Sequence, residues 1–267
     1  MPFRADLHCH STCSDGSCTP QELIDLAIEK GLSGLSITDH DTVDAYSAIS
    51  DNRGLKLLTG VEFSTVLNGK SVHILGYGID VSSQKLLDFC AKHQERRRTR
   101  NRGILSLLEK QGMVISEEEL FAIAGHTVGR PHIAELLVSK GYVDSHQKAF
   151  QKYIGDGKSC YIQGDHFSIE ETLDIIHGAG GISVLAHPHL YHGKRFVKTV
   201  LEKGIRGLEC DYACFPKAQN APWHSLAEEL SLLKTAGSDF HGKKKPGIPL
   251  GASCVDEKTF STLIISL

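Results

Sequence analysis

The stretch ADLHCH, residues 5–10, alternates apolar and polar side chains, which is the pattern of a β-strand. Residues two positions apart on a strand face the same side, so His8 and His10 can both reach one metal ion. Cys9, between them, points into the opposite layer. The stretch therefore predicts a strand that carries two metal-binding side chains.

The stretch GSDFH, residues 237–241, repeats this arrangement near the other end of the chain. Asp239 and His241 share one face of the expected strand, and Phe240 packs behind them. One such pair is weak evidence for a metal site. A closed barrel brings its first and last strands side by side, however, so the two pairs together predict a metal site at one end of a barrel.

Between these two stretches, short apolar strands alternate with amphipathic helices, which predicts a parallel sheet or barrel with right-handed crossovers. Two capping boxes, residues 19–22 and 168–171, mark helix starts, and the dipeptide Asn68-Gly69 predicts a hairpin. We expect strands at residues 5–10, 35–38, 57–66, 71–77, 182–186, 207–212 and 237–241, and helices from residue 19 and at 169–178, 196–202 and 223–235.

The middle of the chain, residues 82–158, shows helical patterns and no strand pattern. We interpret it as a helical subdomain inserted into an α/β domain, which then comprises residues 1–81 and 159–267. The helices of the insert are expected at residues 83–111, 116–124, 131–140 and 146–154.

The composition is that of a globular protein, with 40% of the 267 residues hydrophobic and 23% charged. The 29 Lys and Arg nearly balance the 32 Asp and Glu, and a net charge of −3 argues against a protein that coats nucleic acid. No run of about 18 apolar residues exists, which excludes a transmembrane helix. The N-terminus lacks an apolar signal segment, so we expect a cytoplasmic protein with its eight cysteines reduced.

Side chains that bind metals fall at the ends of the expected strands. This coincidence is informative because α/β barrels build their active sites at the C-terminal rim of the strands. Imidazole and carboxylate ligands without thiolate suit Mn²⁺, Zn²⁺ or Fe²⁺. The residues concerned are His8, His10, Asp39, His40, Glu62, His73, His187, Asp239 and His241.

Motifs at these positions resemble those of the polymerase and histidinol phosphatase (PHP) family, in the order of that family. They extend from residue 6 to residue 241 and together are highly specific. The resemblance implies an α/β fold, a distorted (β/α)7 TIM-like barrel, with a centre of three divalent metal ions. The motifs are Asp6-Leu7-His8-Cys9-His10-Ser11 with Ser14-Asp15-Gly16, Ile37-Thr38-Asp39-His40-Asp41, Gly60-Val61-Glu62, Ala186-His187-Pro188 and Gly237-Ser238-Asp239-Phe240-His241.

The resemblance also implies which residues hold each metal ion, nine in all. Those for the first ion are His8, His10, Glu62 and Asp239. Glu62 would bridge to the second ion, whose other ligands are His73 and His187. Those for the third ion are Asp15, His40 and His241.

Three of these acidic and histidine residues are expected to act in catalysis. Asp15 and His241 would stand beside the leaving group with the third metal ion. Asp39, next to His40, would orient a ligand or act as an acid or base.

The inserted segment indicates which of the family's activities this sequence resembles most. An arginine-rich run, residues 95–102, precedes the segment Gly129-Arg130-Pro131-His132-Ile133-Ala134. The combination resembles the subgroup that removes the 3′-phosphate from nucleoside 3′,5′-bisphosphates or trims short RNA from its 5′ end.

Four insert residues are candidates for substrate binding. Arg130 and His132 begin a helix, where free N–H groups favour anions, so we expect both to bind a phosphate. The alternative for Arg130 is a salt bridge between barrel and insert. Arg96 and Arg100 share a helical face and are expected to meet the substrate, whereas most of the arginine run forms a solvated face.

These features together predict a phosphoesterase that hydrolyses a nucleotide phosphate ester with metal-activated water. The expected partner is a small phosphorylated substrate, either a nucleotide or a short oligoribonucleotide, with no membrane and no stable duplex DNA. Two alternatives are a histidinol-phosphate-type phosphatase and a non-catalytic, metal-binding PHP module that partners replication proteins.

Overall fold

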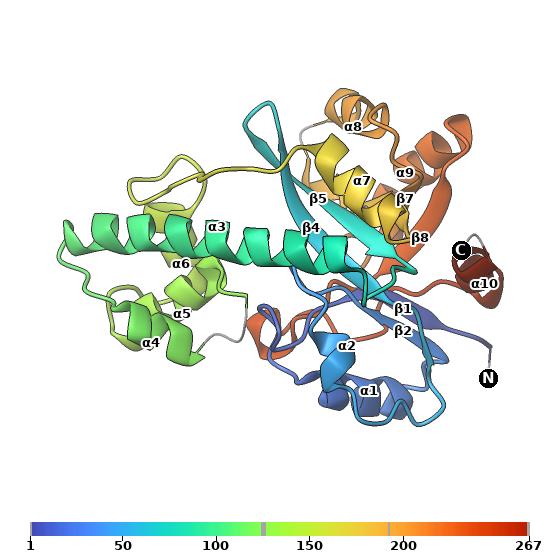
Figure 1. Cartoon of the computed structure of the whole chain (residues 1–267), viewed down its shortest axis with the longest axis horizontal. Coiled ribbons are helices and arrows are strands. Elements are labelled where there is room, and N and C mark those ends of the chain that lie inside the picture. Colours follow the sequence, from blue (N-terminus) through green and yellow to red (C-terminus); the bar gives the residue numbers. More distant parts are fainter. Residues whose placement is uncertain (1, 124–126, 192, 266–267) are drawn as a thin grey trace.

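The computed structural model describes residues 2–123, 127–191 and 193–265 (Figure 1). Its strands form a three-stranded sheet in the order β1-β2-β3 and a five-stranded sheet in the order β4-β5-β6-β7-β8. In these described ranges, no helix is long and apolar enough to cross a membrane. The strands are β1 (Ala5–Cys9), β2 (Gly34–Ile37), β3 (Lys56–Leu57), β4 (Gly60–Leu67), β5 (Lys70–Tyr77), β6 (Ile182–Leu185), β7 (Gly207–Tyr212) and β8 (Leu233–Gly237).

The helices begin where side chains or prolines provide a start signal. Thr19 and Ser168 form the two predicted capping boxes, at the starts of α1 and α7. Two helices, α2 and α10, do not appear among the predicted elements. The helices are α1 (Pro20–Glu29), α2 (Ala45–Ala48), α3 (Gln84–Glu109), α4 (Glu117–Ile123), α5 (Arg130–Ser139), α6 (His146–Ala149), α7 (Ile169–Gly178), α8 (Lys194–Leu201), α9 (Lys217–Glu229) and α10 (Glu257–Ile265).

Most strand pairs are parallel, as predicted, and β5 is antiparallel to its neighbours, as the predicted hairpin requires for its pair with β4. Strands β1 to β3 are parallel, and so are β6 to β8. Strand β5 is antiparallel to both β4 and β6. The reason is the predicted hairpin turn, where Asn68 and Gly69 have φ angles of 51° and 74° that suit a two-residue connection.

Isolated backbone bridges link the two sheets at both edges. Cys9 pairs with Phe240, which joins β1 to the segment after β8, and His40 pairs with Glu62, which joins the segment after β2 to β4. The first and last strands are therefore neighbours. Both bridges lie at residues that carry or flank metal-binding side chains, so the links bring those side chains together.

Three predicted elements have different bounds in the structure. The strand predicted at 57–66 is divided between β3 and β4, which belong to different sheets. The helix predicted at 223–235 is α9, which ends at Glu229 before the left-handed residue Ser231 (φ 53°). The strand predicted at 237–241 is β8, which ends before the left-handed residue Asp239 (φ 55°), so Asp239 lies in the following loop.

Helix α3 connects two hydrophobic cores. Leu86 and Phe89, in its first turns, pack in a cluster with residues of α7 and β4. Ile104 and Leu108, in its last turns, pack in a separate cluster with α4 and α5. Its 26 residues make a helix about 39 Å long, and Figure 1 shows it reaching from the sheets to the helices of the insert.

Candidate metal centre

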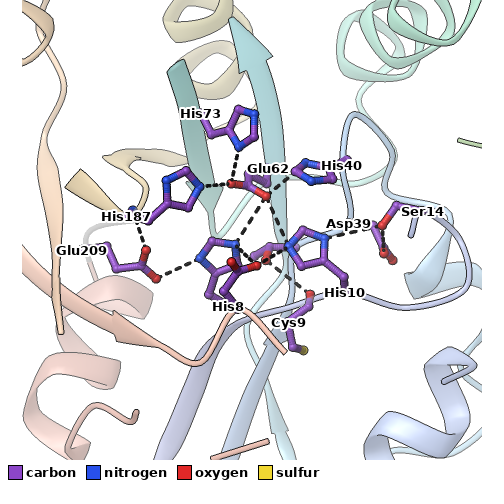
Figure 2. Close-up of polar contacts among 12 residues, drawn as sticks. His8, Cys9, His10, Ser14, Asp39, His40, Glu62, His73, His187 and Glu209 are labelled. Atoms are coloured by element: carbon purple, nitrogen blue, oxygen red, sulfur yellow. Dashed lines mark hydrogen bonds and ion pairs between the residues drawn. The ribbon is translucent and has the colours of Figure 1, made fainter. Parts of the chain in front are cut away.

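Strand β1 ends with the rings of His8 and His10 on one face and Cys9 on the other (Figure 2). Both histidines are fully buried. Cys9 packs with Phe240 in an apolar cluster behind the strand, as the alternation of the sequence predicts. The strand thus separates an apolar layer from a layer of metal-binding groups.

Glu62, on β4, lies at the centre of these groups and is only 1% exposed (Figure 2). Its Oε1 atom is 2.9 Å from Nδ1 of His73 and 2.9 Å from Nε2 of His187. Its Oε2 atom faces the remaining three histidines, at 3.0 Å from Nδ1 of His40, 3.2 Å from Nε2 of His10 and 3.4 Å from Nε2 of His8. One buried carboxylate is therefore surrounded by five imidazoles.

Asp239 and His241, in the loop after β8, complete the other side of the site. The Oδ1 atom of Asp239 lies 3.2 Å from Nε2 of His10 and 3.5 Å from Nε2 of His8. The Nδ1–H of His241 donates to the backbone carbonyl of Asp239 at 2.8 Å. Its Nε2 atom therefore carries the lone pair and faces Asp15, whose Oδ1 lies 3.4 Å away.

Glu209, on β7, supports the centre from behind. Its Oε1 accepts a hydrogen bond from Nδ1 of His8 at 2.9 Å, and its Oε2 accepts one from the backbone N–H of His187 at 2.7 Å. A carboxylate on Nδ1 leaves the Nε2 lone pair of the ring free for a metal ion. Glu209 therefore orients both His8 and the backbone at His187 from behind the centre.

Asp39 also lies behind a histidine. It accepts hydrogen bonds from the backbone N–H of Ser11 at 2.7 Å and from the hydroxyls of Ser11 and Ser14, each at 2.5 Å. The Ser14 hydroxyl lies 3.5 Å from Nδ1 of His10. Of the two roles predicted for Asp39, these contacts favour orientation of a ligand over acid–base chemistry.

Three groups of side chains among the described residues bring ligand atoms within 4.8 Å of one another. The groups are His8, His10 and Asp239; His40, Glu62 and His73; and His10, Asp15, His40 and His241. They resemble the predicted ligand sets, except that His10 and His40 each join a second group and His187 reaches the site through Glu62.

Several buried nitrogens in these groups have no hydrogen-bond partner, namely Nε2 of His8, Nε2 of His10 and Nδ1 of His40. Buried polar atoms are normally paired, and a bound cation satisfies such nitrogens. The residues therefore fit a centre of several divalent metal ions.

The charge states of the site also fit a centre of divalent metal ions. Burial raises the pKa of Glu62, but His40, His73 and His8 outweigh it and hold that pKa well below its usual range. Burial likewise raises the pKa of Asp239, but Lys245 and the neighbouring histidines outweigh it and hold that pKa well below its usual range. Burial lowers the pKa of His40 to about 3, so its ring is neutral, the form that binds metals. Ionised carboxylates and a neutral imidazole are what a divalent ion requires.

A cavity of about 210 Å³ opens onto this centre, and we call it the arginine cavity. Asp15, His40 and His73 line the cavity. A group of arginines also lines it, namely Arg96, Arg97, Arg100 and Arg130. The sequence singles out three of these four as substrate-binding candidates and misses Arg97.

Arg97 is held by Asp41, a contact that sequence patterns do not reveal. The Nε and Nη2 atoms of Arg97 lie 2.6 Å and 2.5 Å from Oδ2 of Asp41. The Oδ1 atom of Asp41 accepts from the backbone N–H of Ser64 at 2.7 Å and lies 3.2 Å from Nδ1 of His93. His93, which the sequence leaves without a partner, thus joins a buried network that ties α3 to the loop bearing His40.

Arg130, at the start of α5, reaches the arginine cavity but also has protein partners. It donates to Oδ1 of Asp156 at 2.6 Å and to the carbonyl of Ile154 at 3.2 Å, and its guanidinium lies 5.3 Å from the ring centroid of Tyr161. The alternative interpretation of Arg130 is a salt bridge between the barrel and the insert. Asp156 lies within residues 82–158, the predicted insert, so this ion pair is not such a bridge.

His132 occupies a different position from Arg130. It is 1% exposed, its Nδ1 accepts a hydrogen bond from the backbone N–H of Gly129 at 3.1 Å, and it is not among the residues that line the arginine cavity. Burial lowers the pKa of His132 to about 4, so the ring is neutral. In this structure it caps α5, and its role in phosphate binding stays a prediction.

Two lysines after His241 form ion pairs with acidic side chains. Lys245 donates to Oδ2 of Asp239 at 2.7 Å, and Lys244 lies 3.3 Å from Oε2 of Glu135 on α5. The loop therefore connects the metal-binding side chains to the insert.

Proteins of known activity resemble this chain over most of its length. A 5′-3′ exoribonuclease of Haemophilus influenzae is 34% identical over 252 residues, which cover 90% of this chain and 91% of the relative. A 3′,5′-nucleoside bisphosphate phosphatase of Chromobacterium violaceum is 31% identical over 256 residues, covering 92% and 90% of the two chains.

Solved structures agree with these similarities. An amidohydrolase from Chromobacterium violaceum, determined with bound sulfate and no metal, superimposes with a TM-score of 0.88 at 29% identity and covers 98% of this chain and 96% of its own. The PHP domain model matches residues 6–170, which contain six of the nine predicted ligands. On these grounds the chain is a member of the PHP domain family.

Proposed function

We propose that this protein is a metal-dependent phosphoesterase that acts on nucleotides. Its substrates are nucleoside 3′,5′-bisphosphates, short 5′-phosphorylated RNA, or both. The observation that carries the proposal is the arginine cavity, which is lined both by four arginines and by Asp15, His40 and His73. A substrate with two phosphates can then meet the metal ligands with one and the arginines with the other.

The nine residues predicted as ligands would hold three divalent ions. Glu62 supplies the central carboxylate, and the unpaired nitrogens of His8, His10 and His40 supply imidazole donors. When bound, divalent ions neutralise phosphate charge and make water a nucleophile near neutral pH. The bridges that join the two sheets support the interpretation of this scaffold as the distorted barrel, with residues 82–158 as an insert that has its own apolar core.

The residues around the centre position the substrate and move a proton. Arg100 and Arg96 orient the distal phosphate from α3, and Arg130 does so from α5. Asp15 and His241, with Oδ1 and Nε2 3.4 Å apart, would hold the water molecule that gives a proton to the leaving ribose oxygen. No serine or cysteine nucleophile is needed for this reaction.

Relatives support the choice of a phosphorylated substrate. The two curated relatives carry names of enzymes that act on RNA and on nucleoside bisphosphates, and the solved amidohydrolase has bound sulfate, an oxyanion of the same charge and shape class as phosphate. The arginine cavity of this chain is suited to such an anion.

The proposal is tested by phosphate and nucleotide release from adenosine 3′,5′-bisphosphate and from a short 5′-phosphorylated RNA, with elemental analysis of the purified protein. We expect turnover of at least one of them, loss of turnover after chelation, and recovery with Mn²⁺ or Zn²⁺. Histidinol phosphate serves as the comparison substrate. Turnover of histidinol phosphate alone, or of none of the three with any metal ion, would reject the proposal.

Replacing Arg130 by alanine is expected to raise KM for adenosine 3′,5′-bisphosphate about ten- to a hundredfold, with a smaller change in kcat, because one charge-assisted contact to the distal phosphate is lost. The measurement is steady-state kinetics. Arg98→Ala is the matched control, since Arg98 lies on α3 with a side chain 47% exposed and outside the arginine cavity. An unchanged KM in Arg130→Ala would remove its assigned role.

A further inference from the structure

A second cavity adjoins the metal centre beside the arginine cavity, and Asp156, the ion-pair partner of Arg130, is among the residues that line it. It has a volume of about 410 Å³ and is lined in part by His187, Leu190, Tyr191 and Phe196. We call it the aromatic cavity. Its volume falls within the range of small-molecule sites, about 300–1,000 Å³.

The two cavities share part of their walls. Ser71 and His73 line both of them, whereas His40 lines only the arginine cavity and His187 only the aromatic one. Figure 2 shows His40 and His187 on opposite sides of Glu62, with His73 between them. The centre therefore lies where one groove changes from a charged half to an aromatic half.

The aromatic half presents flat apolar surface beside a positive charge. The rings of Tyr191 and Phe196 have centroids 6.0 Å apart, and Nζ of Lys70 lies 5.2 Å from the Phe196 centroid. Tyr191 is fixed because its hydroxyl oxygen accepts a hydrogen bond from the backbone N–H of His73, on β5, at 2.9 Å. Leu190 is 52% exposed at the edge, which leaves apolar surface open to a ligand.

A nucleobase matches these surfaces better than a second phosphate does. Bases stack on aromatic side chains whatever their identity, and a lysine beside the ring meets the backbone charge of a polynucleotide. The arginine half, by contrast, suits the phosphate at the end of the substrate.

We propose that the aromatic cavity binds the nucleoside on the 3′ side of the scissile phosphate, so that the groove holds an RNA strand across the metal centre. This inference rests on the proposed function. The 5′-terminal nucleotide occupies the arginine cavity, and the second nucleoside stacks near Phe196. Water adds to phosphorus, the bond to the 3′-oxygen of the first nucleotide breaks, that oxygen takes a proton, and the phosphate stays on the second nucleoside.

The proposal predicts that the two substrate classes occupy different parts of the groove. A nucleoside 3′,5′-bisphosphate has no second nucleoside, so it uses the arginine cavity and the centre alone. A 5′-phosphorylated dinucleotide uses both cavities. Changes in the aromatic cavity should therefore alter the preference between the two substrates.

The test compares kcat/KM for 5′-phosphorylated ApA and for adenosine 3′,5′-bisphosphate in wild-type protein, Phe196→Ala and Leu190→Asp. We expect the ratio of dinucleotide to bisphosphate activity to fall about tenfold in Phe196→Ala, the order expected for one lost base–aromatic contact. Leu190→Asp, at an exposed position, should lower the same ratio by placing a negative charge near the RNA backbone. Phe121→Ala, an exposed aromatic residue of α4, is the matched control with no change in ratio.

The outcomes are distinguishable from failure of the proposed function. Wild-type turnover of the bisphosphate without turnover of the dinucleotide would overturn the aromatic subsite and leave the phosphatase activity standing. An equal fall for both substrates in Phe196→Ala, with no change of ratio in Leu190→Asp, would also overturn it and indicate a structural role for Phe196. No turnover of either substrate by wild-type protein rejects the proposed function itself.

Discussion

Replacing Glu62 by glutamine is expected to lower kcat by about a thousandfold or more and to reduce the divalent metal content of the purified protein. An amide presents one oxygen instead of two, and its NH₂ group meets histidine nitrogens that need an acceptor or a cation. A barrier increase of about 4 kcal/mol corresponds to this loss of rate. Steady-state kinetics and elemental analysis measure the two effects.

The variant is informative because its five imidazole neighbours remain in place. Far-ultraviolet circular dichroism should show an unchanged fold. Glu229→Gln, which alters an exposed carboxylate paired with Lys198, is the matched control and should retain wild-type metal content and rate. Full metal content and full activity in Glu62→Gln would refute the central position that we assign to this carboxylate.

Asp41→Asn should lower the free energy of unfolding by about 3–5 kcal/mol, because it leaves the guanidinium of Arg97 buried beside a neutral amide. Asp41 is fully buried and Arg97 is 7% exposed. Burial raises the pKa of Asp41, but Arg97 and His93 hold it well below its usual range, so the native partner is an anion. Asparagine tolerates the left-handed backbone at this position. The loss of unfolding free energy therefore measures the effect of removing the charge and not a change in backbone strain.

Urea unfolding of the metal-free protein measures the loss without a contribution from bound ions. Asp25→Asn removes the matching charge from the exposed pair with Arg53 and should cost about 1 kcal/mol or less. Adding Arg97→Met to Asp41→Asn should recover part of the loss, because no buried charge is then left unpaired. Equal losses in Asp41→Asn and Asp25→Asn would contradict the role of the buried pair.

Much of the metal centre can be predicted because a strand has a period of two. The alternation of β1 places His8 and His10 on one face and Cys9 on the other, and the structure shows this arrangement. The same argument works less well for Asp239 and His241. They lie beyond the end of β8, and their approach to β1 depends on the loop conformation at Asp239, which no periodicity encodes.

Contacts between distant segments are the part that could not be predicted. Asp41 meets Arg97 across a separation of 56 positions, and nothing local to either residue indicates the pair. The two cavities are likewise products of tertiary packing. Sequence spacing suggests that Arg96 and Arg100 share a helical face, but not that Arg97 turns toward Asp41 or that Tyr191 and Phe196 stand beside the metal ligands.

The backbone at His187 and Asp239 is left-handed, with φ angles of 29° and 55°. This conformation limits which residues can replace the two during evolution. Such a conformation costs most residues roughly 1–2 kcal/mol and is adopted by Asp, Asn and His more readily than by longer or branched side chains. Exchange of Asp239 for Glu would keep the carboxylate yet add a backbone penalty. A lineage that loses the reaction would therefore reach Asn at position 239 more easily than it would reach another metal-binding residue.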